Sequence, residues 1–471
     1  MQKLLNRIFQ VSENDSTIKR EMLAGLTTFL AMAYILAVNP TILGSTGMDK
    51  NGIFVATVLA AALGTMCMAL CANYPFVLAP GMGLNAYFAY TIVGQMGFSW
   101  QFALFAVFCE GIIFLLLSVT NVRETICNAI PQPLKHAVCA GIGLYIAFIG
   151  CQNSNLINDN PATLISLCSF KIADFSNSSL AALLALIGLI ITAVLLSFKV
   201  RGALLLGILI TWCMGMLSQL IGLYQIDVEN GFYSLYPSFD MGMWQDLWGG
   251  FKNVFMQAFS EKSWTREGSI GYGWELVFSL QFIVIIFALL FVDLFDTLGV
   301  LTGTAAQANM LDKDGKLPRI KGALLADSIA TGAGAILGTS TTTTYIESAV
   351  GVSVGGRTGF TAFTAAILFL LALPFAPLFL AIPAFATAPI LIIVGYMMLG
   401  AVQKIDFSDV TIGVPSFCTM IAMPFCYSIS DGVCVGICCW TIINTVMGKF
   451  ERISWMLWIL TILFIAKYAM L

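Results

Sequence analysis

The chain has 471 residues, of which 59% are hydrophobic and only 10% are charged, and its formal net charge is −3. Soluble domains carry about 25% charged residues, so this composition excludes a soluble globular protein and indicates many membrane-spanning segments. No basic patch is large enough to follow a phosphate backbone, and the sequence therefore gives no indication of a nucleic-acid partner.

The motifs of common catalytic and metal-binding classes are missing from the sequence. Thirteen cysteines lie mostly within apolar runs without a C-x-x-C pair, and His136 is the only histidine, so we expect no metal and no cofactor. The phosphate loop G-x-x-x-x-G-K-[ST] and the H-E-x-x-H zinc motif do not occur. An ion gradient is therefore the expected energy source.

Apolar segments fill most of the chain after a polar N-terminus, 1–21, which has no signal-peptide pattern. A membrane span needs about 20 mainly apolar residues. Fourteen segments meet that requirement: 22–40, 52–72, 77–95, 102–120, 133–150, 180–198, 202–223, 276–303, 321–338, 340–354, 357–377, 383–402, 410–428 and 431–447. A further apolar run, 453–470, is either an additional span or an interfacial helix.

The distribution of lysine and arginine predicts the orientation, because these residues accumulate in cytoplasmic loops. With a cytoplasmic N-terminus, sixteen of them fall in inside loops and five in outside loops. The long connections 151–179 and 224–275 then lie outside. Seven segments precede the second of these connections, and since seven is odd, the two halves enter the membrane from opposite sides, as in an inverted repeat.

The third segment of each half is predicted to be broken. In the first half it reads YPFVLAPGMGLNAYFAYTIVG, where Pro80, Gly81 and Gly83 argue against a continuous helix. In the second half it is GTSTTTTYIESAVGVSVGG, with six consecutive Ser/Thr residues that favour extended backbone. Each is interpreted as a short strand followed by a half-helix, which starts near Asn85 and near Thr344 respectively, so that both helix N-termini point to a shared centre.

Five acidic residues within predicted spans are candidates for function, because a carboxylate at membrane depth is costly. They are Glu110, Asp293, Asp296, Asp327 and Glu347. Asp293 and Asp296 are three residues apart and share a helix face, so at most one of them is expected to stay charged when buried. Asp327 is interpreted as a structural hydrogen-bond partner of the threonine run, including Thr343, and no partner is predicted for Glu110.

Two interpretations of Glu347 remain open. Thr344 and Glu347 have the spacing of a capping box, in which the carboxylate satisfies the backbone of the cap residue. Alternatively, the carboxylate accepts N–H groups of a small heterocycle at the start of the half-helix. Aromatic side chains near the breaks are candidates for stacking on a flat ring: Tyr34, Tyr87, Phe88, Phe295 and Tyr345.

The motifs APGMGLNAYFAY, FVDLFDTLGVLTG and ALLADSIATGAGAILGTSTTTTYIESAVGVSVGGRTGFTA resemble those of the nucleobase:cation symporter-2 superfamily. They are most similar to its AzgA-type branch of hypoxanthine, adenine and guanine permeases. The resemblance implies an all-α polytopic membrane protein of 14 segments in a 7+7 inverted repeat, in which a core domain moves against a gate domain as an elevator. Its parts would be the cytoplasmic N-terminus 1–21, core domain 22–120 and 276–377, gate domain 133–223 and 383–447, extracellular loop 224–275 and extra segment 453–470.

The resemblance also implies the site. The family's acids of segments eight, nine and ten fall on Asp296, Asp327 and Glu347, and the substrate lies between segments three, eight and ten. Uracil-transporting relatives have a histidine where this sequence has Val300, so Asp293 is a candidate substitute in proton coupling.

The sequence thus predicts a plasma-membrane secondary transporter that imports a purine base with a proton or another cation, surrounded by lipid and, by resemblance, homodimeric. The expected substrate-binding residues are Glu347, Asp296, Gly83, Asn85, Thr344, Tyr345 and Phe295, and the expected proton-coupling residues are Asp296, Asp293 and Glu347. Alternatives are a same-fold transporter of xanthine, uracil or an inorganic anion and, more remotely, a membrane-embedded hydrolase that uses Asp296 and Asp293.

Overall fold

The computed structural model describes residues 8–14, 16–119, 131–160, 163–171, 175–200, 202–227, 232–237, 242–266, 273–307, 310 and 317–470. These residues form mainly helices. The α-helices are α2 (Ile18–Met32), α3 (Ile35–Gly44), α4 (Lys50–Cys67), α5 (Met82–Ala86), α6 (Trp100–Val119), α8 (Gln132–Asn153), α9 (Asn177–Ser197), α10 (Ala203–Leu220), α11 (Met243–Val254), α12 (Trp274–Val277), α13 (Leu280–Gln307), α14 (Ile320–Leu337), α15 (Ser348–Val354), α16 (Gly359–Leu371), α17 (Ala376–Leu380), α18 (Ala384–Met398), α19 (Val410–Phe425), α20 (Ile429–Val446) and α21 (Trp455–Met470). The strands are β1 (Leu78–Pro80), β2 (Ile157–Asn160), β3 (Leu164–Leu167) and β4 (Thr342–Thr344).

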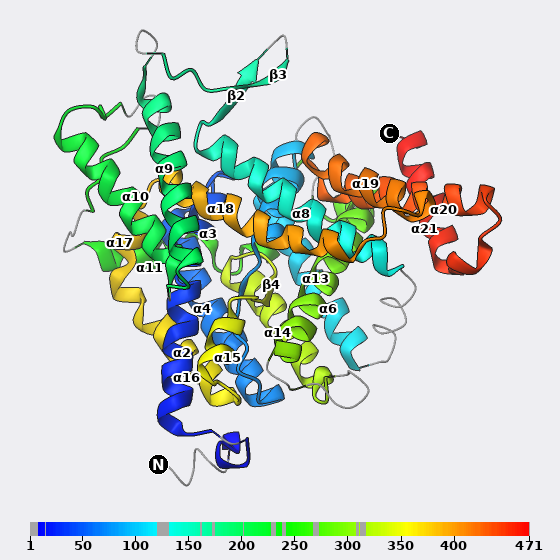
Figure 1. Ribbon diagram of the computed structural model, residues 1–471, viewed down its shortest axis with the longest axis horizontal. Coiled ribbons are helices and arrows are strands. Elements are labelled where there is room, and N and C mark those ends of the chain that lie inside the picture. Colours follow the sequence, from blue (N-terminus) through cyan, green and yellow to red (C-terminus); the bar gives the residue numbers. More distant parts are fainter. Residues whose placement is uncertain are drawn as a thin grey trace.

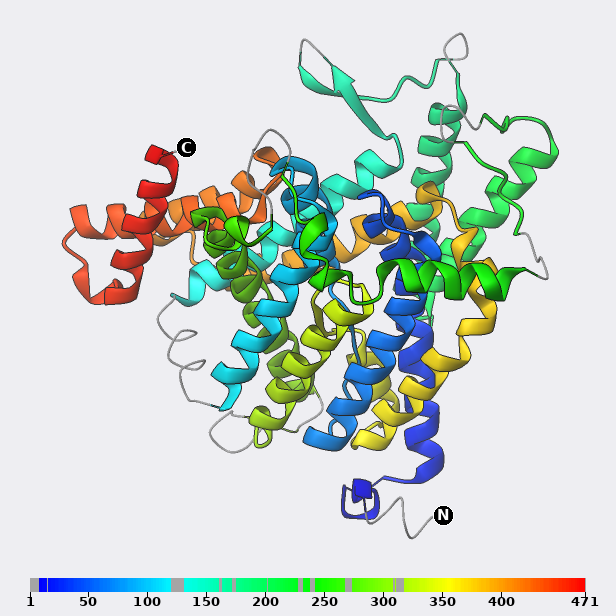
Figure 2. The ribbon, with the colours of Figure 1, turned by 180° about the vertical axis from the view of Figure 1, so that it is seen from behind.

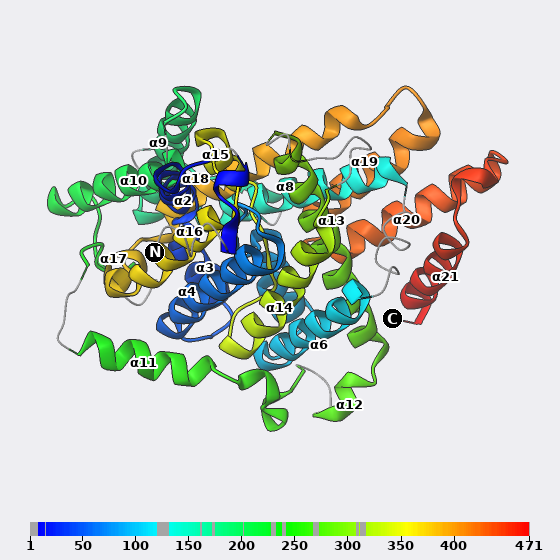
Figure 3. The ribbon, with the colours of Figure 1, turned by 90° about the horizontal axis from the view of Figure 1, so that it is seen from below.

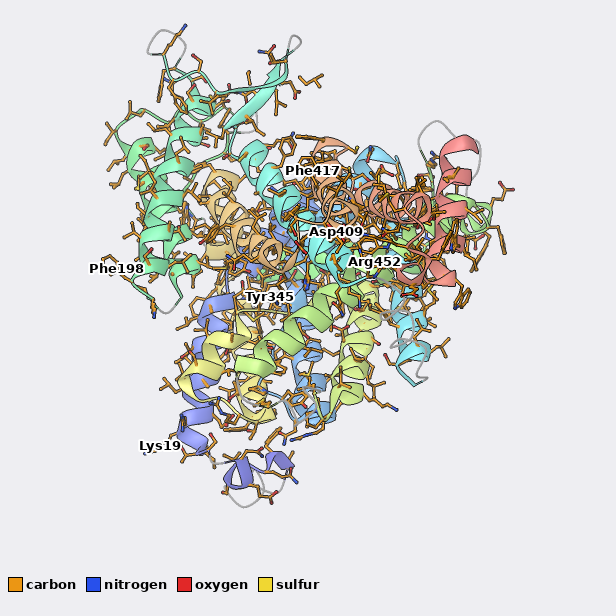
Figure 4. The ribbon with its side chains drawn as sticks, turned by 45° about the vertical axis from the view of Figure 1, so that its right-hand side comes forward. Lys19, Phe198, Tyr345, Asp409, Phe417 and Arg452 are labelled. Carbon is orange, nitrogen blue, oxygen red and sulfur yellow. The ribbon has the colours of Figure 1, made fainter. Side chains whose placement is uncertain are left out.

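Many of the helices are long enough to cross a membrane. Among the described residues, eight helices are long and apolar enough to cross a membrane. The number is nine if Gly359–Leu371 and Leu373–Leu380, which meet at a bend of 43°, form one span. Large apolar side chains such as Phe198 (78% exposed) and Phe417 (52% exposed) lie on the outside (Figure 4). Exposure of this kind is unfavourable in water but suits a lipid surface. The chain is therefore an integral membrane protein, while the layout in fourteen segments remains a prediction.

Polar residues at the helix ends explain where several helices begin. Thr17, Asp49, Ser176, Asp409 and Ser428 each precede a helix and accept a hydrogen bond from a backbone N–H of its first turn. These are the residue types that satisfy the unpaired N–H groups of a helix start. Residues next to each helix in the sequence thus specify where α2, α4, α9, α19 and α20 begin. Their apolar faces, in contrast, find packing partners only in the folded chain.

The helices pack in two groups around a small central sheet. Strands β1 and β4 pair antiparallel near the centre of the molecule (Figure 1). Helices α2, α3, α4, α6, α14, α15 and α16 mainly contact one another around this pair, whereas α8, α9, α10, α18, α19 and α20 mainly contact one another outside it. In Figure 1, α9 and α10 lie along one side of the molecule and α19, α20 and α21 lie along the opposite side. Strands β2 and β3 form a separate hairpin at the end opposite the N-terminus.

Helix α11, in the connection 224–275, runs crosswise to its neighbour α4 (Figures 2 and 3). Its buried side holds Leu247, Gly250 and Val254, and its exposed side includes Trp244 and Trp248. A Cβ atom on Gly250 would lie 2.9 Å from the backbone nitrogen of Gly52, so the absence of a side chain permits this close crossing. Tryptophan is enriched at membrane–water interfaces, which fits a helix that lies along the membrane surface.

Glu21 joins the first helix to α16. Helix α2 starts at Ile18, four residues before the predicted first segment, and Glu21 is fully buried. Its carboxylate accepts hydrogen bonds from the backbone N–H groups of Arg357 (3.0 Å) and Thr358 (3.3 Å) and from the Thr361 hydroxyl (2.5 Å). Glu21 therefore fixes the turn through which the chain passes from α15 to α16.

The C-terminal helix α21 follows a small ion network. Asp409 accepts a hydrogen bond from the Thr411 hydroxyl and pairs with Arg452 (2.9 Å) and Lys449 (3.3 Å) (Figure 4). The Thr411 hydroxyl and, after it, Arg452 hold the pKa of Asp409 well below its usual range. This network ties the turn before α21 to the start of α19, while α21 itself packs on α20.

Candidate functional site

The polar run from Thr339 to Thr344 is buried at the centre of the first helix group. Gly338 ends α14 with a φ of +99°, a left-handed conformation that favours glycine, and the chain then becomes extended. Residues of the run are attached to five helices through these pairs: Thr339 with Asn39 (3.0 Å), Ser340 with Asn85, Thr341 with Glu110 (2.6 Å), Thr343 with Thr297 (2.8 Å) and the Thr342 carbonyl with Thr331 (3.1 Å). The run is thus a common attachment point for α3, α5, α6, α13 and α14.

The backbone of this run is paired with β1. Beyond the β1–β4 ladder, the Gly81 N–H donates to the Thr341 carbonyl (2.9 Å) and the Tyr345 N–H donates to the Val77 carbonyl (3.0 Å). Extended backbone at membrane depth is tolerated only where protein or a wet cavity satisfies its polar groups. The two broken segments therefore supply hydrogen-bond partners for each other's backbone groups.

A short helix follows each strand, as the sequence predicts, but its starting residue differs from the prediction. Helix α5 starts at Met82 rather than near Asn85, and α15 starts at Ser348 rather than near Thr344. The cause is the strand register, because β4 occupies Thr342–Thr344 and keeps that stretch extended. On the other strand, pairing ends at Pro80 and leaves the following residues free to turn into a helix.

Glu347 lies immediately before α15 and is 7% exposed. Its Oε1 accepts a hydrogen bond of 2.8 Å from the hydroxyl of Tyr34, which lies at the break between α2 and α3. The capping-box interpretation is wrong, since Glu347 itself occupies the cap position without a side-chain cap bond, and the buried Thr344 hydroxyl has no partner within the described part of the chain. A carboxylate accepts through two oxygens, so the contact with Tyr34 leaves Glu347 with further accepting capacity.

Helix α13 carries two acids with different surroundings. Asp293 is fully buried, whereas Asp296 is half-buried and close enough to Asp327 and Glu347 for their charges to interact. Asp327, also fully buried, accepts a hydrogen bond from the Thr297 hydroxyl, which in turn contacts Thr343. The predicted partnership of Asp327 with the threonine run thus passes through Thr297.

The remaining predicted site residues also gather here. The Ser340 hydroxyl donates to Asn85 Oδ1, and the buried Asn85 amide nitrogen has no partner among the residues that the structure describes. The Tyr345 hydroxyl donates to the Pro80 carbonyl (2.5 Å), so Tyr345 is engaged in the sheet. A Cβ atom on Gly83 would lie 2.8 Å from Ile142 Cγ2, which places α5 directly against α8. Phe295 belongs to α13, but its side chain is outside the described residues.

Several contacts of the site were not predicted from the sequence. Asn39 donates to Thr57 (2.6 Å) as well as to Thr339, and its isolated polarity in the apolar run ILAVNP is a signal that could have identified it. Thr297 follows Asp293 by four residues, a spacing at which side chains on one helix face meet. The partner of Glu110, Thr341, has no such signal because the two residues meet only in the tertiary fold.

Comparison with known sequences shows similarity over the whole chain. The sequence model of the Permease family matches residues 19–433. The chain is 40% identical over 476 residues to the guanine/hypoxanthine permease PbuG of Bacillus subtilis, covering 99% of this chain and 100% of the relative. It is 38% identical over 467 residues to the adenine permease AdeP of Escherichia coli, covering 99% of this chain and 96% of the relative.

Solved structures with the same fold are more distant in sequence. The transmembrane domain of the cyanobacterial bicarbonate transporter BicA superposes with a TM-score of 0.60 at 13% identity, covering 88% of this chain and 96% of that domain. SLC26A9 superposes with a TM-score of 0.61 at 9% identity, covering 95% of this chain and 69% of that protein. At such identities the likeness concerns the fold.

Proposed function

The chain belongs to the Permease family of the nucleobase:cation symporter-2 type, and from that membership we propose that it imports the purine bases hypoxanthine, adenine and guanine by proton symport. Family membership makes the protein a permease and not an enzyme, which removes the hydrolase alternative. The full-length relatives named as guanine/hypoxanthine and adenine permeases support purines as the substrate class.

The observation that carries the proposal is the buried carboxylate of Glu347 beside the central sheet. Purine bases present ring and exocyclic N–H groups, which need an acceptor, and a carboxylate accepts but does not donate. Hydrogen bonds to a charged group contribute about 1.5–3 kcal/mol each. We assign Glu347 to the N–H edge of the base and the half-buried Asp296 to a second contact and to coupling, with Asp293 as a further coupling candidate.

The rest of the proposed site comes from the two half-helices. The sequence also assigned the backbone amides of Asn85 and Tyr345 to the base, but the Asn85 N–H donates to the Gly81 carbonyl (2.8 Å) and the Tyr345 N–H to the Val77 carbonyl (3.0 Å). The backbone amides near Gly83 and at Thr344 would instead complete the polar contacts, and the Asn85 side-chain amide nitrogen, which has no partner among the described residues, offers a donor to a ring nitrogen or carbonyl of the base. Phe295 would stack on the ring. Asp327 and Thr343 are structural parts of the same polar core.

For the transport cycle we propose a 7+7 inverted repeat in the plasma membrane with a cytoplasmic N-terminus. The group around β1 and β4 would be the moving core domain, and the group of α8–α10 with α18–α20 would be the static gate. The preference of each group for contacts within itself supports this division, because a moving body needs few contacts across its boundary. Substrate bound at the β1–β4 centre would then travel with the core.

An inorganic anion is the alternative substrate within the same fold. The acids Asp296 and Glu347 argue against it, since an anion site needs arginine or bare helix N-termini. Xanthine or uracil would use the same acceptors, so only uptake measurements distinguish them from hypoxanthine, adenine and guanine as substrates.

Uptake of labelled bases into vesicles that contain the purified protein tests the proposal. We expect hypoxanthine, adenine or guanine to accumulate when the outside is more acidic than the inside, and a protonophore to abolish accumulation. Excess unlabelled purine should compete, and excess sulfate should not. Sulfate uptake without purine uptake would overturn the proposal.

Replacement of Tyr34 by phenylalanine is expected to weaken purine binding by about tenfold. The change removes the hydroxyl that holds Glu347 Oε1 and leaves the packing of the ring intact. One hydrogen bond to a charged group corresponds to roughly this factor, since 1.4 kcal/mol is tenfold. The dissociation constant of labelled hypoxanthine measures the effect, and Tyr236→Phe, at a 46% exposed tyrosine outside the site, is the control. An unchanged constant for Tyr34→Phe would contradict a role in orienting Glu347.

A further inference from the structure

The turn between α19 and α20 has a tyrosine where its backbone favours glycine. The Ser428 N–H donates to the Met423 carbonyl (3.0 Å). The Tyr427 N–H donates to the Pro424 carbonyl (3.4 Å), which completes the Schellman motif of helix ends. Tyr427 occupies the left-handed position of this motif with a φ of +53°. Because a Cβ atom is unfavourable in that conformation, the reason for a tyrosine lies in contacts outside the turn.

The Tyr427 ring lies among three other aromatic rings. Its centroid is 5.9 Å from that of Tyr90, 5.5 Å from that of Tyr145 and 6.1 Å from that of Phe148, all in edge-to-face geometry. Such pairs are favourable beyond the apolar area that they bury. Tyr145 and Phe148 belong to α8 of the proposed gate. Tyr90 belongs to the π-helical segment Tyr87–Gln95, which continues α5 and packs on α3 and α6 of the proposed core, so the ring of Tyr427 joins the gate to the core.

The π-helical segment also makes polar contacts with the gate. These are the Thr91 hydroxyl with the Tyr145 hydroxyl (3.4 Å) and with the Tyr427 carbonyl (3.4 Å), the Asn153 amide with the Tyr90 hydroxyl (3.3 Å) and the Gln95 amide with the Cys426 carbonyl (3.4 Å). The separations are roughly 0.3–0.7 Å longer than the commonest ones, so each bond is weak. Weak contacts of this kind can close an interface and still separate during a transport cycle.

This interface lies at the outer end of the molecule in the proposed orientation. The π-helical segment leads to Phe98, which forms a β-bridge with Arg266 of the connection 224–275. Farther in, a Cβ atom on Gly83 would lie 2.8 Å from Ile142 Cγ2, so α5 packs directly on α8. The contacts run inward through residues that are exposed (Gln95 and Cys426), half-buried (Tyr90 and Tyr427) and buried (Thr91 and Tyr145).

We propose that Tyr90, Thr91, Tyr145 and Tyr427 form an outer latch, which holds the core against the gate and closes the substrate site to the outside. This inference rests on the proposed function, which makes one helix group a moving core and the other a static gate. To load a base from outside, the ring pair of Tyr90 with Tyr427 and the contacts of Thr91 have to separate. The strength of the outer latch therefore sets the fraction of time for which the site is open to the outside.

Replacement of Tyr427 by glycine tests the outer latch, because it removes the ring and gives the turn the residue that its backbone favours. Ile142, 3% exposed and one helical turn inward of Tyr145, is the position for a reporter thiol. In right-side-out membrane vesicles that contain Ile142→Cys, a membrane-impermeant maleimide should modify position 142 slowly. Addition of Tyr427→Gly should make this reaction about three- to tenfold faster, the range expected for loss of a ring pair. Mass spectrometry of the peptide with position 142 separates this reaction from those of other cysteines.

Transport kinetics give a second measurement, without the reporter. Tyr427→Gly should lower the half-saturating concentration of external hypoxanthine by about three- to tenfold, because a larger fraction of the protein is open to the outside. Binding of hypoxanthine in detergent, where the site is reached from both sides, should change by less than about twofold. Tyr427→Phe keeps the ring, and Tyr233→Gly makes the glycine substitution at an exposed tyrosine of the connection 224–275, so both should match the wild type.

The possible results separate the inference from the proposed function. An unchanged reaction at position 142 with Tyr427→Gly, or an equal acceleration with Tyr427→Phe, would overturn the inference, while purine transport would stand. Acceleration only for maleimide enclosed inside the vesicles would overturn it as well. The thiol reaction needs no substrate, so the expected reaction rates in a protein that neither binds nor transports purines would overturn the proposed function alone.

If Tyr427→Gly does not fold, Thr91→Val decides. Valine keeps the shape of threonine and removes the hydroxyl that faces Tyr145 and the Tyr427 carbonyl. We expect the reaction at position 142 to become about threefold faster, since weak hydrogen bonds between core and gate are lost. A rate equal to that of Ile142→Cys alone would overturn the inference.

Discussion

Replacement of Glu347 by glutamine is expected to weaken purine binding by about 30- to 100-fold and to abolish measurable uptake at low substrate concentration. The glutamine side chain has nearly the same shape, and its oxygen can still accept from Tyr34. Its amide group, however, places a donor where the carboxylate offered an acceptor to the N–H edge of the base. The lost charge-assisted hydrogen bond and the new donor that faces the N–H group of the base together cost about 2–3 kcal/mol of binding free energy, which corresponds to this factor.

The measurement is equilibrium binding of labelled hypoxanthine to the purified protein in detergent, followed by uptake in vesicles. Glu451→Gln makes the same chemical change at an exposed residue near the C-terminus and should bind like the wild type. Asp296→Asn should also weaken binding, because Asp296 is assigned a second contact to the base. If Glu347→Gln bound hypoxanthine within twofold of wild type, Glu347 would not be the acceptor, and the proposed site would have to be moved.

Replacement of Glu21 by alanine is expected to lower the free energy of unfolding by about 3–5 kcal/mol. The carboxylate accepts from two backbone N–H groups and one hydroxyl in a fully buried position, and alanine leaves all three donors without it. Removing one partner of a buried charged network typically has a cost of this size. Because the turn at Arg357 and Thr358 also ends the segment that starts with Glu347, loss of purine binding should accompany unfolding.

Thermal unfolding in detergent, with and without hypoxanthine, measures this effect. Glu13→Ala changes an exposed glutamate in the short turn before α2 and should leave the unfolding temperature unchanged. Glu21→Gln, which keeps one acceptor oxygen, should fall between alanine and the wild type. A Glu21→Ala protein as stable as Glu13→Ala would show that water replaces the carboxylate at this turn.

Sequence patterns predicted the local features of the site well. Pro80 and Gly81 mark the end of β1, and the six hydroxyl residues mark extended backbone around β4. Eight described helices, long and apolar enough to cross a membrane, coincide with predicted apolar runs, because hydrophobic length is a property of the chain itself. Where a helix starts after a strand was predicted less well, since the register of β1 against β4 decides it and no single segment contains that information.

Contacts between distant residues escaped prediction for a related reason. In the sequence Glu21 is the last residue of a polar tail, yet it accepts from two donors in the turn before α16 and one in α16, all more than 330 positions away. Thr297 read as one more polar residue on α13, and its role between Asp293 and Asp327 depends on the approach of α14. Hydrogen bonds that connect helices follow from packing angles, which hydropathy does not specify.

The pairing of β1 with β4 has a consequence for how the protein is made. The Tyr345 hydroxyl and the Pro80 carbonyl it contacts are separated by 265 residues, so the ribosome completes the first half of the chain long before β4 exists. During that interval the Leu78 backbone can still pair with the Thr65 hydroxyl, but the backbone groups of β1 that pair with β4 lack those partners, which is costly in lipid. The first half should therefore remain at the insertion machinery, or in contact with water, until the second half arrives. A chain truncated after α10 should be recovered as a substrate of membrane quality-control proteases rather than as a stable half-transporter.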